Sequence, residues 1–158
     1  PTYGVSNAPV EAGSGALNGD VVTFRGASGG GSVQLQASDT VTLLGTITAD
    51  GMVGGKNYGG GGSGGAIYIN CRTFIGDSNG VLRAEGGRAH WGATVSGGGG
   101  GGGRIAVWRK NDLSGSLVSN SVNGGEWYDT VAGTTNNAES GTILWGWLPS
   151  GGTVIRSR

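Results

Sequence analysis

A short apolar motif that begins with glycine recurs four times along this chain at nearly constant spacing. The four copies lie 34, 38 and 38 residues apart and begin at Gly31, Gly65, Gly103 and Gly141. A second glycine-led motif follows about half a period later, with both spacings equal to 35 residues, and begins at Gly45, Gly80 and Gly115. Two motifs that share one period indicate a repeat protein, because a general excess of glycine produces no common phase.

Apolar residues alternate with other residues inside each motif. In the stretch Gly65-Ala66-Ile67-Tyr68-Ile69, for example, the two isoleucines are two positions apart. This alternation is typical of a half-buried strand, and glycines bound each apolar run. Glycine also interrupts every window long enough for a helix, so we expect only strands and loops.

Parallel stacking of the repeats brings equivalent side chains into columns, and each repeat then covers the apolar edge of its neighbour. We expect three such columns to form the structural core: Val33, Ile67, Ile105 and Ile143; Leu35, Ile69, Val107 and Trp145; and Ile47, Leu82 and Leu117. The sequence therefore predicts an all-β fold, namely a parallel β-helix (β-solenoid) of about four short rungs.

Glycine-rich tracts connect the second motif of one repeat to the first motif of the next. They span residues 52–64, 86–102 and 124–140, at the same phase of each repeat. We expect them to leave one side of the solenoid and to stack there as a second layer. Without side chains their backbones can pack closely as extended segments resembling polyproline II, for the reason that collagen needs glycine at its axis. The alternative is a set of flexible tethers.

Length and charge limit the domain organisation and the classes of partner. We expect an extended N-terminal arm over residues 1–20, which contain no full repeat, and one glycine-rich solenoid domain over residues 21–158. No apolar run reaches 18 residues, which argues against a membrane span. Ten basic side chains balance ten acidic ones, so nucleic acid is not an expected partner. The start at Pro1, with no initiating Met and no signal-peptide apolar segment, is typical of a processed or trimmed product.

Few side chains in the chain suggest catalysis or metal binding. His90 is the only histidine, which excludes a histidine-based triad or a multi-histidine metal site within one chain. Polysaccharide cleavage needs convergent carboxylates with basic groups, and the nearest cluster consists of Arg109, Lys110 and Asp112. We interpret that cluster as a solvated turn, and we expect neither an enzyme nor a cofactor.

For Cys71 and for the stretch from Gly76 to Gly80 we prefer a structural role to a functional one. Cys71 stands two residues after Ile69, in the inward register of its strand, so we expect a small buried side chain rather than an intermolecular disulfide. The stretch Gly76-Asp77-Ser78-Asn79-Gly80 has the oxygen-rich composition of a short calcium loop. The same residue types are ordinary turn formers, and we expect a turn.

The glycine blocks and the strands that follow them resemble a known kind of module. The stretches that carry the resemblance are Tyr3-Gly4, Pro9, Gly13-Ser14-Gly15, Gly60–Ile69 and Gly97–Trp108. They resemble the glycine-rich repeat modules of large bacterial surface and secreted proteins, which look like parallel β-helices. The resemblance implies an extracellular or cell-surface location and a structural or adhesive role, and it supplies no catalytic motif. The third repeat departs from the pattern at Ser119 and Ser121 and in its loop at residues 126–129.

A solenoid exposes strand edges at both ends, and an unprotected edge can pair with another chain. Repetition of a head-to-tail contact produces an open filament. We therefore expect a self-assembling structural subunit of a filament or surface matrix, whose partners are copies of itself. The expected subunit contacts are Tyr3, Val5, Val10, Trp145, Trp147, Val154 and Ile155.

Other functions remain open at this stage. An adhesin or carbohydrate-binding module would hold surface glycans through aromatic side chains of the loop layer, namely Tyr58, Trp91, Trp127 and Tyr128. Ice binding would need a flat threonine face, for which Thr40, Thr42, Thr46 and Thr48 supply a start. For Trp145 and Trp147 we favour capping of the core or a subunit contact over stacking on sugar rings.

Overall fold

The structure is a computed structural model that describes residues 5–17, 26–55, 59–90, 97–113, 117–129 and 132–149. These ranges contain strands, turns and extended segments but no helix, so none of them holds a helix able to cross a membrane. The strands are β1 (Ser32–Gln36), β2 (Thr40–Leu43), β3 (Thr46–Thr48), β4 (Ala66–Asn70), β5 (Thr73–Gly76), β6 (Val81–Arg83), β7 (Arg104–Arg109), β8 (Asn111–Asp112), β9 (Ser119–Ser121), β10 (Glu126–Asp129), β11 (Thr134–Asn137) and β12 (Thr142–Trp147). The predicted all-β class is confirmed.

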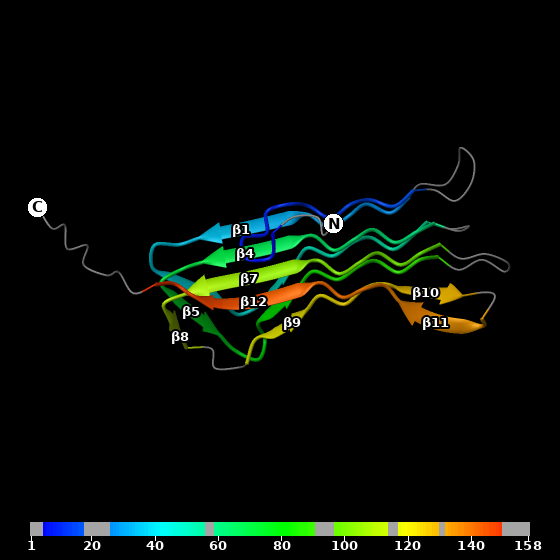
Figure 1. The fold of residues 1–158 in the computed structure, drawn as a ribbon. Helices are drawn as coiled ribbons and strands as arrows, with labels where there is room; N and C mark the ends of the chain where they lie inside the picture. Colours follow the sequence, from blue (N-terminus) through cyan, green and yellow to red (C-terminus); the bar gives the residue numbers. More distant parts are fainter. Residues whose placement is uncertain are drawn as a thin grey trace, which may run out of the picture.

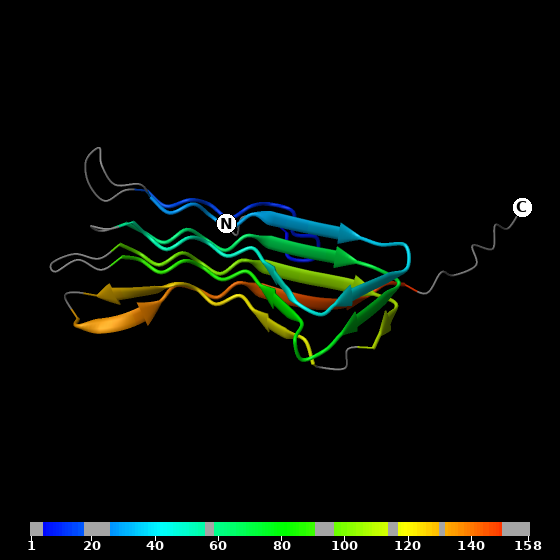
Figure 2. The same cartoon turned by 180° about the vertical axis from the view of Figure 1, so that it is seen from behind.

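Three small parallel sheets each take one strand from each of the first three repeats. The first sheet has the order β1-β4-β7-β12, the second β2-β5-β8 and the third β3-β6-β9. The chain thus runs through the three sheets in turn before the next repeat begins (Figure 1). Figure 2 shows the second and third sheets from behind, with the glycine tracts leaving all repeats on one side. In the described part of the fourth repeat the only strand is β12, so the first sheet is one strand longer than the other two parallel sheets.

The register of the first sheet is the one that the motif spacing predicts. Val33 pairs with Ile67, Ile67 with Ile105, and Ile105 with Ile143. Two residues further along, the second row contains Leu35, Ile69, Val107 and Trp145. Because residues two apart share a face of a strand, both rows point to the same side of the sheet.

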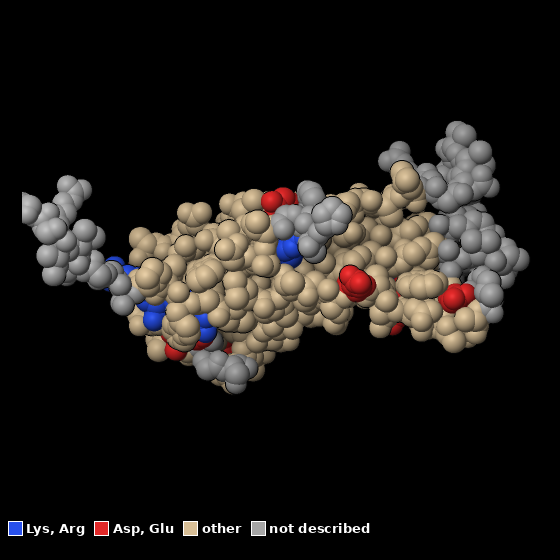
Figure 3. Space-filling view, in the orientation of Figure 1, with Lys and Arg blue, Asp and Glu red and all other residues tan. Residues whose placement is uncertain are grey.

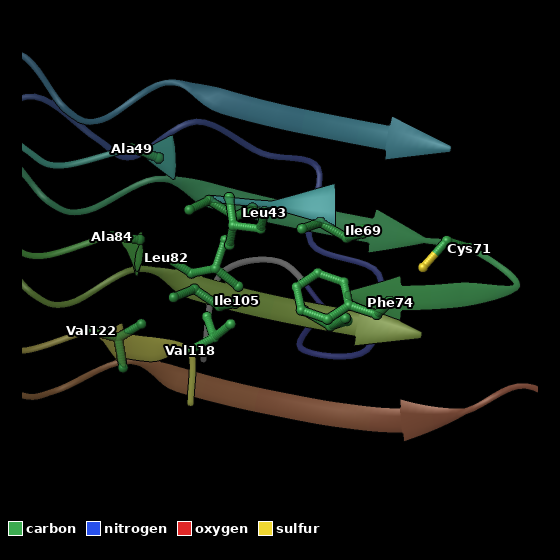
Figure 4. Packing of buried hydrophobic residues seen from close by; sticks show 12 residues of the cluster. Leu43, Ala49, Ile69, Cys71, Phe74, Leu82, Ala84, Ile105, Val118 and Val122 are labelled. Carbon is green, nitrogen blue, oxygen red and sulfur yellow. The ribbon is translucent and has the colours of Figure 1, made fainter. Parts of the chain in front are cut away.

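The core lies between the three sheets and is most complete in the middle repeats (Figure 4). Ile67, Ile69, Ile105 and Val107 are fully buried, whereas Leu35 is 36% exposed and Ile143 is 38% exposed. Leu35 and Ile143 belong to the outermost strands of the sheet and therefore lack a neighbour on one side. In the second and third sheets, Phe74 and Leu82 are fully buried and Ile47 packs against the cluster.

The predicted third column is wrong in its last member. Leu82 pairs with Asn120 rather than aligning with Leu117, which is 58% exposed. The inward positions of the third repeat are taken by Val118 and Val122, both buried, on either side of Asn120. The paired residues Leu82 and Asn120 are thus 38 residues apart, as Ile67 and Ile105 are in the first sheet. Burial of the two valines sets this register. Ser119 and Ser121 consequently align with outward positions of β6.

The glycine tracts form a hydrogen-bonded layer beside the sheets. We call 49–55, 84–90 and 122–125 the outgoing tracts, and 26–31, 59–65, 97–103 and 138–141 the return tracts. Successive amides of the second return tract reach different neighbours: Gly61 N donates to Gly98 O, Gly62 N to Met52 O, Ser63 N to Ser14 O, and Gly64 N again reaches the third return tract at Gly101 O. A cycle of three residues, with no bonds inside the segment, is the pattern of polyproline II.

Each kind of tract forms its own level of this layer. Outgoing tracts bond side by side, as Gly51 N does to Glu85 O and Gly86 N to Asn123 O, and return tracts do the same. Bonds such as Gly87 N to Gly62 O join the two levels. These segments are therefore an ordered part of the fold rather than tethers. The third outgoing tract ends differently, in the antiparallel hairpin β10–β11, whose turn places Gly133 at a φ of 66°.

Residues 5–17 lie against the body of the molecule. The Trp108 indole Nε1 donates to the Asn7 carbonyl at 2.6 Å, and Pro9 is fully buried. Residues 11–17 then run antiparallel to the first return tract, as Gly13 N donates to Gly30 O and Ala16 N to Ala27 O. They form a third level outside the return tracts. Tyr3, Val154 and Ile155 lie outside the described residues.

Candidate assembly surfaces and polar groups

The end of the stack at β12 is closed by two tryptophans around an arginine. Trp145 packs edge-on against Phe74, with ring centroids 5.3 Å apart. Arg109 is only 7% exposed, and its guanidinium carbon lies 4.9 Å from the ring centre of Trp145 and 4.3 Å from that of Trp147. Trp147 itself is 60% exposed, so this end presents an aromatic surface to solvent.

Arg109 is held in place by one carboxylate and one carbonyl. Its Nε and Nη2 both donate to Asp112 Oδ2, at 2.8 and 2.6 Å, and Nη1 donates to Gly146 O at 3.1 Å. The interpretation of this cluster as a solvated turn is therefore wrong for Arg109, whose charged side chain is buried, whereas Lys110 is exposed at a bend between β7 and β8. With its donors used by structural partners and its faces covered by aromatic rings, the guanidinium serves as a cap of the core.

Gly146 shows why the strand that forms this end contains a glycine. A Cβ built on Gly146 would lie 2.5 Å from Cε3 of Trp108, whose ring lies against the neighbouring strand position. Only glycine allows that close approach. The outer face of the sheet is thereby closed by Trp108, while Trp145 and Trp147 close the inner side.

The opposite end of the stack, at β1, differs from the interior in what surrounds its glycines. A Cβ on Gly65 would lie 1.9 Å from Gly31 O, one on Gly103 2.2 Å from Gly65 O, and one on Gly141 1.7 Å from Gly103 O. Each of these glycines is required by the backbone of the preceding repeat. Gly31 has no atom of the described residues within 4 Å of the same position, so no contact in that part of the chain requires its glycine.

The two levels of the glycine layer do not continue this pattern at the β1 end. Gly62 and Gly87 would direct a Cβ onto Ser28 O and Met52 O of the preceding repeat. Ser28 and Met52 themselves carry side chains at the equivalent outward positions, and Met52 is 61% exposed. A further glycine layer in the same register is therefore obstructed here, whereas no described residue covers the sheet edge beside Gly31.

A polar column crosses the outer side of the third sheet. Arg83 forms an ion pair with Asp50 at 2.6 Å, and Asp50 also accepts hydrogen bonds from Thr48 Oγ1 and from the amide of Glu85. In the next repeat the Glu85 carboxylate accepts a hydrogen bond from Ser121 Oγ. Each group is occupied by an adjacent repeat, so the column joins repeats and leaves no free reactive pair.

The pKa of Asp50 reflects this arrangement. Partial burial alone would raise the pKa, but the hydrogen bonds from Arg83, Thr48 and the Glu85 amide, together with the charge of Arg83, outweigh it and lower the pKa below its ordinary value. The same pairing raises the pKa of Arg83. Both groups remain charged at neutral pH and support the contact between repeats.

A polar concavity lies where the third outgoing tract meets the hairpin β10–β11. It has a volume of about 550 Å³ and is lined by Glu85, Arg88, Asn123, Glu126, Asn137, Ser140 and three glycines. Trp127 and Tyr128 belong to the adjoining strand β10. The spacing of motifs did not reveal this groove, because its walls come from two repeats and from the hairpin.

The remaining predicted sites have structural surroundings. Cys71 is 1% exposed and unpaired, and burial raises the pKa of its thiol. Asp77 accepts a hydrogen bond from the amide of Asn79 at 2.8 Å, as in an ordinary turn. His90 lies at the edge of the described residues, and its Nδ1 is buried without a partner among them. Within the same part of the chain no three metal-ligating side chains gather.

The predicted contact and binding residues are distributed over several surfaces. Val5 and Val10 are 51% and 44% exposed on the N-terminal segment, far in sequence from Trp147. Tyr58 and Trp91 lie outside the described residues. Figure 3 shows few charged side chains on the face that carries the first sheet; most of the basic ones gather where β7 and β12 end, whereas most of the acidic ones lie toward the glycine tracts. Sequence reasoning missed the cap formed by Arg109. The available signal was the alternation of inward positions along β7, which continues from Ile105 and Val107 to Arg109.

Comparison of the chain with protein-family models, with curated proteins and with solved structures finds no match. The resemblance to bacterial surface modules therefore stays a prediction.

Proposed function

We propose that the chain is a β-solenoid that serves as a self-assembling structural subunit of an extracellular filament or surface matrix. The observation that carries the proposal is the unexplained glycine at the β1 end. Within the ranges that the structure describes, Gly31 is the one member of its column of four that has no backbone against it, and a strand edge of a second copy is the group that would supply one. The location outside the cell rests on the family resemblance alone.

The two ends of the stack offer complementary edges for such a contact. β1 and β12 are the outer strands of the first sheet, and both run parallel to their neighbours. If β12 of one copy pairs with β1 of the next, Gly31 of the second copy lies against the backbone of Gly141 of the first. This is the relation that Gly141 has to Gly103 within one chain. The apolar rows then continue across the contact, which covers the partly exposed side chains of Leu35 and Ile143.

This contact is limited to the sheets. Because Ser28 and Met52 obstruct continuation of the glycine layer, the two copies have to meet mainly through the sheet edges and the aromatic cap. A contact of that kind is heterologous, since one copy contributes β1 and the other β12. Repetition therefore gives a linear assembly rather than a closed dimer.

The test compares two leucine substitutions at glycines that have open space in the monomer. Gly31→Leu places a side chain at the β1 edge, and Gly98→Leu places one on the glycine layer away from both ends; neither glycine has an atom within 4 Å of a built Cβ. We expect light scattering and negative-stain microscopy to show fibres for the unmodified chain and for Gly98→Leu, but monomers for Gly31→Leu. A monomeric unmodified chain at all concentrations, or fibres of Gly31→Leu equal to those of the unmodified chain, would refute the proposal.

The polar groove beside the hairpin favours a second candidate, an adhesin or carbohydrate-binding module. Carboxylates and amides of Glu85, Glu126 and Asn137 line one open concavity, and sugar hydroxyls are bound by groups of this kind. Trp127 lies on the adjoining strand and is partly buried. Binding to a glycan array that disappears with Asn137→Ala and with Trp127→Ala, but persists with Gly31→Leu, would support this function over the filament.

A further inference from the structure

Residues 11–17 show how the outer face of a return tract binds an extended segment. Gly13 N and Ala16 N, three residues apart, donate to Gly30 O and Ala27 O, each at 2.8 Å. On the other side of the segment, Ser63 N of the second return tract donates a hydrogen bond to Ser14 O at 3.0 Å. Two amides three residues apart therefore satisfy two carbonyls that a return tract directs outward.

Glycine at two positions of the first return tract makes this contact possible. A Cβ on Gly26 would lie 1.7 Å from Ala16 O, and one on Gly29 would lie 1.9 Å from Gly13 O. Any side chain there would hold the segment away from the carbonyls. The segment itself needs glycine at residue 13, because a Cβ on Gly13 would lie 2.2 Å from Ser63 O.

The third return tract presents the same face, and none of the described residues occupies it. Counting back from the paired glycines Gly31 and Gly103, Gly98 and Gly101 correspond to Gly26 and Gly29. A Cβ on Gly98 would meet nothing within 4 Å, and one on Gly101 would meet only Glu139 O at 3.8 Å. The second return tract differs, since Ser63 carries a side chain at the corresponding position.

The hydrogen-bonding groups of this face are also unused. Gly99 O and Gly102 O correspond to Ala27 O and Gly30 O, and within the described ranges neither accepts a hydrogen bond. Both residues are partly exposed. We call Gly98, Gly99, Gly101 and Gly102 the open tract face. It combines outward carbonyls three residues apart with a surface free of side chains.

We propose that the open tract face binds an extended, glycine-rich peptide segment of a partner chain. Two amides of that segment, three residues apart, donate to Gly99 O and Gly102 O as Ala16 and Gly13 do in the first repeat. Recognition is by backbone hydrogen bonds and close packing, so the segment needs glycine at the position of Gly13. The site does not depend on the end-to-end contact at Gly31, because it lies on the side of the stack.

The experiment uses a peptide with the sequence of residues 11–17 and the monomeric Gly31→Leu protein, so that its outcome is independent of fibre formation. The control peptide replaces Gly13 by alanine. Amide signals in NMR spectra of ¹⁵N-labelled protein report the site. We expect concentration-dependent shifts at residues 97–103 and at Glu139 with the first peptide, and binding about tenfold weaker with the control.

A second protein variant separates docking from nonspecific contact. Gly101→Leu fills the open tract face at a position that tolerates a side chain, so its spectrum should retain the dispersion of the folded protein while the peptide-induced shifts disappear. The proposal is overturned if the peptide shifts no signals in residues 97–103. It is equally overturned if the alanine peptide binds as well, or if Gly101→Leu leaves the shifts unchanged.

Discussion

Two glycines of one tract, two residues apart, should respond in opposite ways to the same substitution. Gly98 and Gly100 both belong to the return tract 97–103. A Cβ on Gly98 would meet no atom within 4 Å, whereas one on Gly100 would lie 2.0 Å from Gly62 O and 2.4 Å from Gly62 C. We predict that Gly98→Ala stabilises the protein and that Gly100→Ala destabilises it.

The magnitude follows from how far the tract must move. Real Cβ atoms essentially never approach another heavy atom closer than 3.0 Å, so Gly100→Ala requires a shift of about 1 Å. That shift strains the bonds from Gly100 N to Gly87 O and from Gly125 N to Gly100 O. Overpacking and weakened hydrogen bonds together should lower the free energy of unfolding by about 2–4 kcal/mol.

Gly98→Ala acts mainly on the unfolded chain. The native φ of Gly98 lies outside the left-handed region, so alanine can adopt the same backbone conformation. The loss of unfolded-state entropy should raise the free energy of unfolding by about 0.4–1 kcal/mol.

Denaturant unfolding of the two variants and the unmodified chain, followed by circular dichroism, measures both effects. The samples should carry the Gly31→Leu background so that assembly does not contribute to stability. Equal midpoints for the two alanine variants, or a destabilised Gly98→Ala, would refute the packing of return tracts described here. Residues 97–103 would then behave as a tether, in which neither position matters.

Three further predictions concern the contacts between repeats. Asp50→Asn should lower the free energy of unfolding by about 0.2–1 kcal/mol at pH 7. The contribution of Asp50 is present only while its carboxylate is ionised, so the difference in urea midpoint between the variant and the unmodified chain should vanish as the pH falls below the lowered pKa of Asp50. Asp112→Ala leaves Arg109 buried without its carboxylate and should lower stability by about 3 kcal/mol, seen as a reduced melting temperature. Leu117→Ser should change stability by less than about 0.5 kcal/mol, whereas Leu82→Ala should cost about 2–5 kcal/mol; a large effect at Leu117 would contradict the register of β9.

The rows of the first sheet could be predicted because the relevant pattern is local and repeated. Each strand begins at a glycine and alternates apolar with other residues, so equal phase implies equal position in the stack. The third sheet shows the limit of this reasoning. Gly115 begins the same kind of motif as Gly80, but β9, the strand that pairs with β6, begins four residues after Gly115. Burial of Val118 and Val122 decides this register.

The groups of the candidate surfaces depended on contacts that no local pattern specifies. Arg109 appeared as part of a turn, and only the strand β12 packed beside it brings Trp145 and Trp147 over its guanidinium. The polar groove likewise combines Glu85 with Asn137, which are distant in sequence. Long-range partners of this kind follow from the stacking order, which sequence spacing implies only for the regular positions.

The sequence by itself determined the period, the strand content and the two apolar rows that stack through all four repeats, because side chains of alternating polarity can satisfy only one register. The tertiary structure alone decided how the glycine tracts pair and which of their faces remain open. Glycine carries no side chain that could distinguish one register from another, so the choice rests on backbone hydrogen bonds and on the absence of a Cβ at each point of contact.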